Sequence, residues 1–218
     1  MLRKLASAII VLLLVFGLAS AVYADLSVGV KKGDWIEYTV TTTGTPTAGH
    51  NVNSSRLEVT DIQGTNITVY ITSTLSDGST KNFNSTLILQ TGHLIDDFII
   101  PANLNAGDSF LDDIRGIVTI NSSDQHTYAG AIRTVLTSTS GQNTYIWDKA
   151  TGVSVEATSV EPEYTMHTIV KDTNMWQPSE AAGGLDATAL VLVAVVVVIA
   201  IVVAALLAFR YQKKKMSQ

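Results

Sequence analysis

The stretch Tyr145-Ile-Trp-Asp-Lys-Ala-Thr-Gly-Val-Ser-Val-Glu156 predicts two β-strands joined by a tight turn. Tyr145 and Trp147 fall on one face of the first strand, because successive strand residues point to opposite sides. Gly152 closes the turn, since glycine adopts a positive φ without a steric penalty. The stretch therefore predicts an antiparallel hairpin whose register is fixed by this turn.

Strand-like runs flank this hairpin on both sides. Thr127–Thr139 precedes it across the short connection Ser140-Gly141-Gln142, and Tyr164–Lys171 follows it across Glu161-Pro162-Glu163. Short connections between extended runs are typical of antiparallel neighbours. Residues 127–171 are thus expected to form a four-stranded meander.

Alternating apolar and polar residues mark further half-buried strands nearer the N-terminus. Gly64-Thr65 and Asp77-Gly78 separate them as hairpin turns, since these pairs supply positive φ. The runs lie at 36–41, 56–60, 67–72 and 82–89.

The middle of the chain is less regular. Leu94–Ile100 ends at Pro101, the segment Pro101–Asp108 reads as a loop, and Ile114–Asn121 is expected to be a strand. Together the runs predict a mainly β fold, an antiparallel meander that forms a curved half-barrel or a β-sandwich.

Both ends of the chain carry apolar runs. Arg3 and Lys4 precede the apolar segment Leu5–Leu18, and small residues then offer cleavage after Ala21 or Ala24. This order is typical of a secretory signal peptide.

The second apolar run, Ala187–Phe209, has 23 residues without a charge, and a basic cluster follows at Arg210–Lys215. As a helix it would span roughly 34 Å, enough to cross a hydrocarbon core of about 30 Å. Positive charge favours the cytoplasmic side, so the upstream domain is expected outside a cell membrane crossed once. Trp176, which precedes the run, is expected to pack on the domain. The predicted organisation is a signal peptide at 1–24, an extracytoplasmic β-domain at 25–172, a juxtamembrane linker at 173–184, a transmembrane helix at 185–209 and a cytoplasmic tail at 210–218.

The exported region is acidic and the chain has no cysteine. Residues 25–184 hold eight Lys and Arg against 18 Asp and Glu, which gives a net charge of −10. Such a surface repels nucleic acid. The absence of cysteine excludes disulfides, thiol catalysis and Cys-ligated metals.

No catalytic residue and no cofactor site is predicted. The four histidines, at positions 50, 93, 126 and 167, lie in no zinc-binding spacing. The sequence has no nucleophile elbow of the Gly-x-Ser-x-Gly type, no phosphate-binding loop and no dinucleotide-binding glycine pattern.

Acidic residues flank the middle loop: Asp96-Asp97 and Asp112-Asp113, with Asp108 between them. Clustered loop carboxylates can hold Ca²⁺ or act as glycosidase acids. Neither pair follows an EF-hand spacing, so solvated loop charge is the preferred interpretation and no metal site is predicted.

Four Asn-x-Ser/Thr sequons are candidate glycosylation acceptors in an exported protein. They begin at Asn53, Asn66, Asn84 and Asn121.

Tyr145–Glu156, together with Gly33-Asp34-Trp35-Ile36-Glu37-Tyr38, resembles uncharacterised exported archaeal surface proteins that share a signal, a β-domain and a terminal helix. More remotely, the meander is similar to lipoprotein-carrier half-barrels of the LolA and LppX type. The first resemblance implies no activity. The second implies an apolar ligand held against a curved sheet.

Three functions follow, in order of preference. The first is a non-catalytic, membrane-anchored surface or envelope domain that binds an envelope partner or supports the envelope. The second is a lipid or lipoprotein carrier with an apolar half-barrel pocket. The third is a hydrolase that uses the loop carboxylates. A continuous apolar groove would favour the carrier, and carboxylates converging in a cleft would favour the enzyme.

Overall fold

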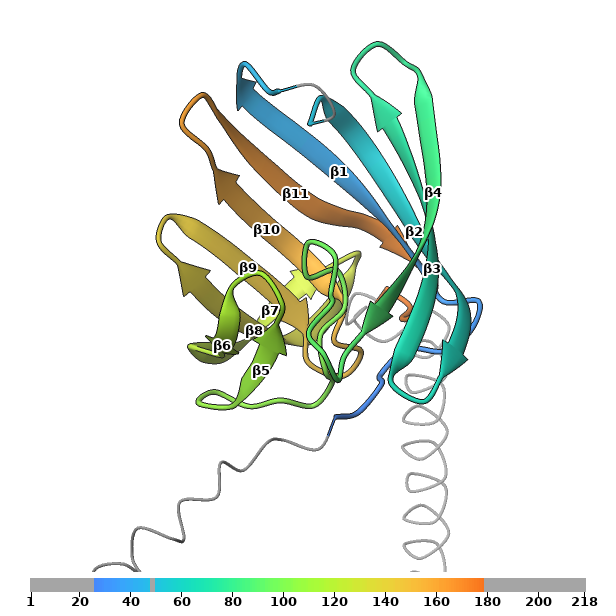
Figure 1. The fold of residues 1–218 in the computed structure, drawn as a ribbon, viewed down its shortest axis with the longest axis vertical. Helices are drawn as coiled ribbons and strands as arrows, with labels where there is room; N and C mark the ends of the chain where they lie inside the picture. Colours follow the sequence, from blue (N-terminus) through green and yellow to red (C-terminus); the bar gives the residue numbers. More distant parts are fainter. Residues whose placement is uncertain (1–25, 48–49, 179–218) are drawn as a thin grey trace, which may run out of the picture. The chain divides into compact units, whose positions relative to one another are not determined.

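The computed structural model describes residues 26–47 and 50–178, and these form an antiparallel β-structure (Figure 1). Nine strands make one sheet in the spatial order β4-β3-β2-β1-β11-β10-β9-β8-β7, and a small second sheet pairs β5 with β6. In chain order the strands are β1 (Trp35–Gly44), β2 (Val52–Gln63), β3 (Asn66–Leu75), β4 (Thr80–Ile88), β5 (Ser109–Asp112), β6 (Gly116–Thr119), β7 (Ser122–Tyr128), β8 (Ala131–Ser140), β9 (Asn143–Asp148), β10 (Ser154–Val160) and β11 (Tyr164–Thr173).

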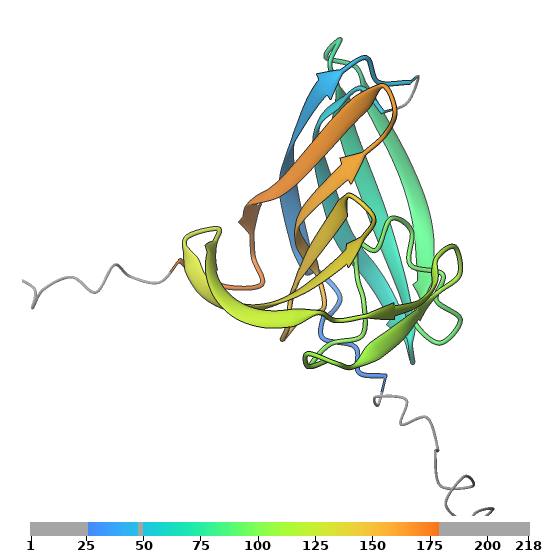
Figure 2. The same ribbon diagram turned by 90° about the vertical axis from the view of Figure 1, so that its left-hand side faces the viewer.

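The large sheet consists of two meanders joined by the pairing of β1 with β11. One meander is β1 to β4 and the other is β7 to β11, so the first and last strands lie side by side at its centre. Figure 2 shows the sheet curving around a concave face. The predicted mainly β antiparallel meander is confirmed, and the described strands form one main sheet rather than two large stacked ones.

The predicted turns account for the register. Gln63 pairs with Asn66 across a two-residue turn in which Gly64 has a φ of 61°. Gly152, in the turn between β9 and β10, has a φ of 73°. Tyr145 and Trp147 share the face predicted for them, and their rings stack with centroids 5.8 Å apart. Both glycine positions are therefore confirmed as positive-φ turn residues.

Residues 89–121 fill part of the concave face. The indole Nε1 of Trp147 donates to the backbone oxygen of Asp97 at 2.8 Å, and Ile99 forms an isolated β-bridge with Val153. The segment's buried side chains join a single apolar core with the strands. They are Leu89, Leu94, Ile99, Ile100, Leu104, Phe110, Val118 and Ile120.

One strand prediction was wrong. The run Thr127–Thr139 is not a single strand, because the chain reverses at Ala129 and Gly130 between β7 and β8. Both residues have positive φ, 46° and 76°. Ala-Gly is a weak turn signal, since alanine rarely adopts this conformation. Strand β6 is also shorter than predicted, because Ile114 lies in the turn that precedes it.

The segment after β11 packs on the β-domain. Trp176 is buried, and its Nε1 donates to the backbone oxygen of Tyr128 at 3.1 Å. The predicted signal peptide and transmembrane helix lie outside the described residues. Within residues 26–47 and 50–178, no helix has the length and apolar character needed to cross a membrane.

Candidate functional site

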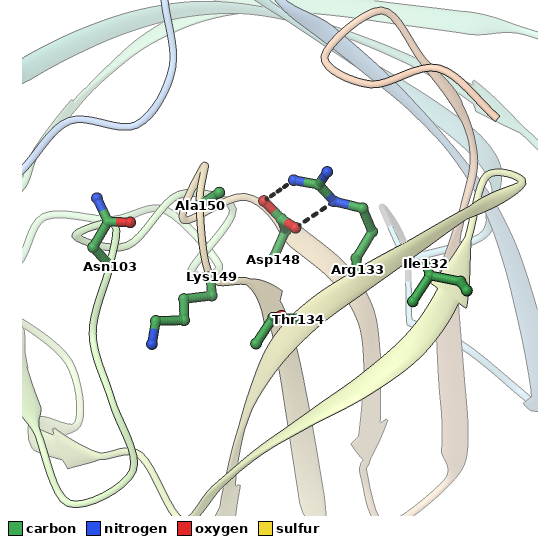
Figure 3. A pocket seen from close by; sticks show the side chains of 7 residues that line it. All are labelled: Asn103, Ile132, Arg133, Thr134, Asp148, Lys149 and Ala150. Atoms are coloured by element: carbon green, nitrogen blue, oxygen red, sulfur yellow. Dashed lines mark hydrogen bonds and ion pairs between the residues drawn. The ribbon is translucent and has the colours of Figure 1, made fainter. Parts of the chain in front are cut away.

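A pocket of about 290 Å³ lies between strand β8 and the β9–β10 turn (Figure 3). Backbone hydrogen bonds hold its walls together: Lys149 donates to Thr134 O at 2.9 Å, and Asn103 donates to Lys149 O at 2.7 Å. The neighbouring strands β8 and β9 and the more distant segment around Asn103 therefore meet here. The lining residues are Asn103, Ile132, Arg133, Thr134, Asp148, Lys149 and Ala150.

Asp148 fixes the geometry of this pocket. Its side chain is buried and accepts two hydrogen bonds from Arg133, at 2.8 and 3.1 Å. It also accepts from the backbone N–H and the hydroxyl of Thr151, at 2.9 and 2.8 Å. A buried carboxylate with four donors is fully paired, and the fork of contacts with Arg133 restricts both side chains. The guanidinium also lies 4.8 Å from the ring of Trp176.

The pocket carries an excess of positive charge. Asp148 balances the charge of Arg133, whereas the Nζ of Lys149 donates to the neutral amide oxygen of Asn105 at 2.8 Å. No ion pair joins Lys149 to a carboxylate within the described part of the chain. The side-chain amide of Asn103 adds a polar group to the rim. Cationic and amide donors together suit a carboxylate or phosphate group.

The pocket's size limits what it can enclose. Ligand pockets commonly measure about 300–1,000 Å³. At about 290 Å³ the pocket suits a small group rather than a whole lipid or cofactor. Arg133 and Lys149 were not predicted as site residues. Each is a single cation in a strand or turn, and only the tertiary fold places both in the lining of one pocket.

The predicted acidic residues separate into distinct contacts. Asp97 and Asp112 are buried, and both contact Arg115: its Nη2 donates to Asp97 Oδ2 and its Nε donates to Asp112 Oδ2 at 3.0 Å. The guanidinium lies 4.3 Å from the ring centre of Tyr145. These two carboxylates therefore pair with the guanidinium of Arg115 and do not line the pocket.

The remaining acidic candidates lie elsewhere. Asp113 Oδ2 pairs with His93 Nδ1 at 2.7 Å, and Asp108 Oδ2 accepts from Asn105 N at 2.7 Å within its own loop. Asp96 is exposed. Across residues 26–47 and 50–178, no group of three or more His, Asp or Glu is arranged to hold a metal ion.

Asp97 and Asp112 share the guanidinium of Arg115, and their pKa values shift in opposite directions. Burial, reinforced by a hydrogen bond with Asp112, raises the pKa of Asp97 to about 7 despite Arg115. Burial would also raise the pKa of Asp112, but the N–H of Arg115 and further hydrogen bonds hold it below its usual value. Asp97 Oδ1 and Arg115 Nη1 are buried without a hydrogen-bond partner.

The remainder of the concave face is not a continuous apolar groove. Cross-strand register places on this face a set of half-buried side chains, most of which carry a hydroxyl group. They are Val40, Thr42, Ser55, Ser73, Ser85, Ala157, Ser159, Met166 and Thr168. Ser55 Oγ and Ser73 Oγ pair with each other at 3.1 Å, and covering this face with a hydrocarbon ligand would desolvate its hydroxyl groups at a cost in free energy.

All four sequon asparagines are exposed. Asn53 and Asn84 lie within β2 and β4, and Asn66 begins β3. Asn121 differs, because its Oδ1 accepts from the N–H of Thr139 at 2.8 Å. Exposure is compatible with glycosylation at each position.

Comparison with known proteins gives no family assignment for this chain. No protein-family model matches this chain, and no curated protein matches it. Among solved structures, the chain is similar to the siderocalin Ex-FABP, which is described as functioning through dual ligand specificities. The sequence identity is 12% and the TM-score 0.24, over 74% of this chain and 80% of that one. At this TM-score the likeness supports no inference about function.

Proposed function

We propose that the protein is a membrane-anchored surface protein whose exported β-domain is non-catalytic and binds a small anionic group. The observation that carries the binding role is the pocket of Arg133, Lys149 and Asn103. In a region of net charge −10, a pocket with surplus positive charge is an exception to the surrounding surface. Local charge of one sign in a concavity raises the local concentration of oppositely charged ligands.

The membrane anchor rests on the sequence. Ala187–Phe209 is long enough to span a bilayer, and Arg210–Lys215 gives its orientation. Arg3 and Lys4 followed by the apolar Leu5–Leu18 support export. Integral attachment by one span is therefore part of the proposal, with the β-domain outside and the C-terminus in the cytoplasm.

The two alternatives have less support. A lipid carrier needs an apolar cavity, whereas the open part of the concave face is rich in Ser and Thr. A hydrolase that uses Asp97 and Asp112 needs both acids facing a substrate, whereas both are buried against Arg115. The binding role is accordingly preferred to both.

Inorganic phosphate should bind this pocket weakly and saturably. Trp176 is the reporter, because its ring lies 4.8 Å from the guanidinium of Arg133. With fluorotryptophan incorporated in the full chain, we expect the Trp176 resonance in fluorine NMR to shift and saturate, with a Kd on the order of 1 mM. Trp35, which lies against Arg56 instead, provides an internal reference.

A matched pair of lysine variants tests the site. Lys149→Gln should weaken phosphate binding about tenfold, because it removes a charge-assisted hydrogen bond. Lys81→Gln makes the same change on the exposed edge strand β4 and should leave binding unchanged. Equal effects of the two variants, or a shift that follows ionic strength without saturation, would contradict the proposed site.

A further inference from the structure

The β5–β6 hairpin presents apolar side chains to solvent. Ile114, Ile117 and Leu111 are 85%, 72% and 42% exposed. Leu111 and Ile117 are cross-strand partners, and the other face of the hairpin is buried through Phe110 and Val118. We call Leu111, Ile114 and Ile117 the apolar hairpin face. Contiguous exposed apolar patches mark interaction surfaces, whereas single exposed apolar residues are ordinary.

The apolar hairpin face is held rigidly. Asp112 Oδ1 accepts the backbone N–H groups of Ile114 and Arg115, both at 2.7 Å, and so fixes the turn. Asp113 N donates to Gly92 O at 2.9 Å, which fastens the hairpin to the rest of the domain. A preorganised surface loses little conformational entropy when it binds.

We infer that the apolar hairpin face contacts the lipid bilayer. This inference rests on the proposed membrane anchor. Eight residues separate Pro178 from Ala187, a tether of at most about 29 Å. Pro178 lies against Gly130, and the hairpin meets the far part of β8, where the hydroxyl of Ser138 donates to Thr119 O. The stretch from Gly130 to Ser138 is about 26 Å long, which is less than the tether length, so the tether allows the hairpin to reach the membrane surface.

Charge indicates which kind of bilayer suits this surface. Asp113 lies in the hairpin turn and Asp108 immediately precedes β5. Carboxylates beside the aliphatic side chains repel anionic headgroups, so a zwitterionic surface is the better occupant. A protein partner is the competing occupant, and the experiment separates the two.

The cysteine-free chain allows a direct test in nanodiscs of phosphatidylcholine. The full chain is labelled with an environment-sensitive fluorophore at Ile117→Cys, or at Thr80→Cys as an exposed control at the start of the β4 edge strand. We expect the label at 117 to be quenched at least twofold by lipid-attached quenchers and shielded from iodide. The label at 80 should show the reverse. Adding Ile114→Asp should abolish the lipid quenching at 117.

Each other outcome overturns the inference in a distinguishable way. Equal iodide quenching at 117 and 80, in protein that co-purifies with nanodiscs, would leave the anchor intact and show that the apolar hairpin face points to water. Shielding from iodide without lipid quenching would place another protein surface there. Failure of the chain to co-purify with nanodiscs would remove the anchor and the bilayer contact together.

Discussion

Gly152→Val should destabilise the domain by about 4 kcal/mol or more, which lowers its melting temperature by more than about 8 °C. Two effects add. A valine at the observed φ of +73° adopts a left-handed conformation, at a cost of about 1–2 kcal/mol. Its Cβ would also overlap the backbone oxygen of Ile100, which cannot move freely because Ile100 N donates to Gly152 O at 2.9 Å.

Gly141→Val provides the matched control for this prediction. Gly141 also has a positive φ, +61°, but no atom lies within 4 Å of the position that a Cβ would occupy. This variant should lose only the conformational contribution, about 1–2 kcal/mol. Thermal unfolding followed by circular dichroism measures both. Equal losses would show that the close approach between the β9–β10 turn and residues 89–121 does not stabilise the fold.

The second prediction with a large expected effect concerns Asp97, which should make the free energy of unfolding depend on pH. Burial raises its pKa from 3.8 to about 7 in the folded protein, so the folded state holds the proton more tightly than the unfolded chain does. The stabilising contribution of Asp97 is therefore complete below about pH 4 and is lost as the pH rises towards 7. Burial is the main cause of the raised pKa, and Arg115, with one positive charge for two buried carboxylates, offsets it only in part.

Asp97→Asn imitates the protonated acid at every pH. Denaturant unfolding should give similar free energies for this variant and the wild type near pH 4. Near pH 8 the variant should be more stable, by on the order of 2 kcal/mol. A variant that is less stable than the wild type at pH 8 would show that Asp97 acts as an ionised partner of Arg115, contrary to this account.

Most of the strand order was accessible from the sequence because it depends on local chemistry. Gly64 and Gly152 supply the positive φ of their turns, and alternation of apolar residues identifies the buried face of each neighbouring strand. The hairpin at Ala129 was missed for the corresponding reason. Its backbone conformation is unfavourable for alanine and is maintained by tertiary structure, since Gly130 lies against Pro178 and Tyr128 O accepts from Trp176.

The candidate site was much less predictable. Arg133 and Lys149 line the same pocket because β8 pairs with the residues around the β9–β10 turn. Asn103 belongs to the segment 89–121, which packs against that turn. None of these residues follows a sequence motif. Conversely, the sequence favoured solvated loop charge for Asp97 and Asp112, with metal or acid chemistry as the weaker hypothesis, whereas the structure buries both against Arg115. Sequence shows which residues can carry chemistry, whereas tertiary packing decides which of them meet.

The central claim is that an exported β-domain is held at a membrane by the C-terminal apolar run. Fractionation of cells that express the full chain, or a chain stopped at Gly184, tests it most directly. The full chain should stay in the membrane pellet through an alkaline wash, and external protease should digest its β-domain. The shortened chain should appear in the medium as a soluble, β-rich protein. A shortened chain that still sediments with membranes, or a full chain that washes off, would contradict the account.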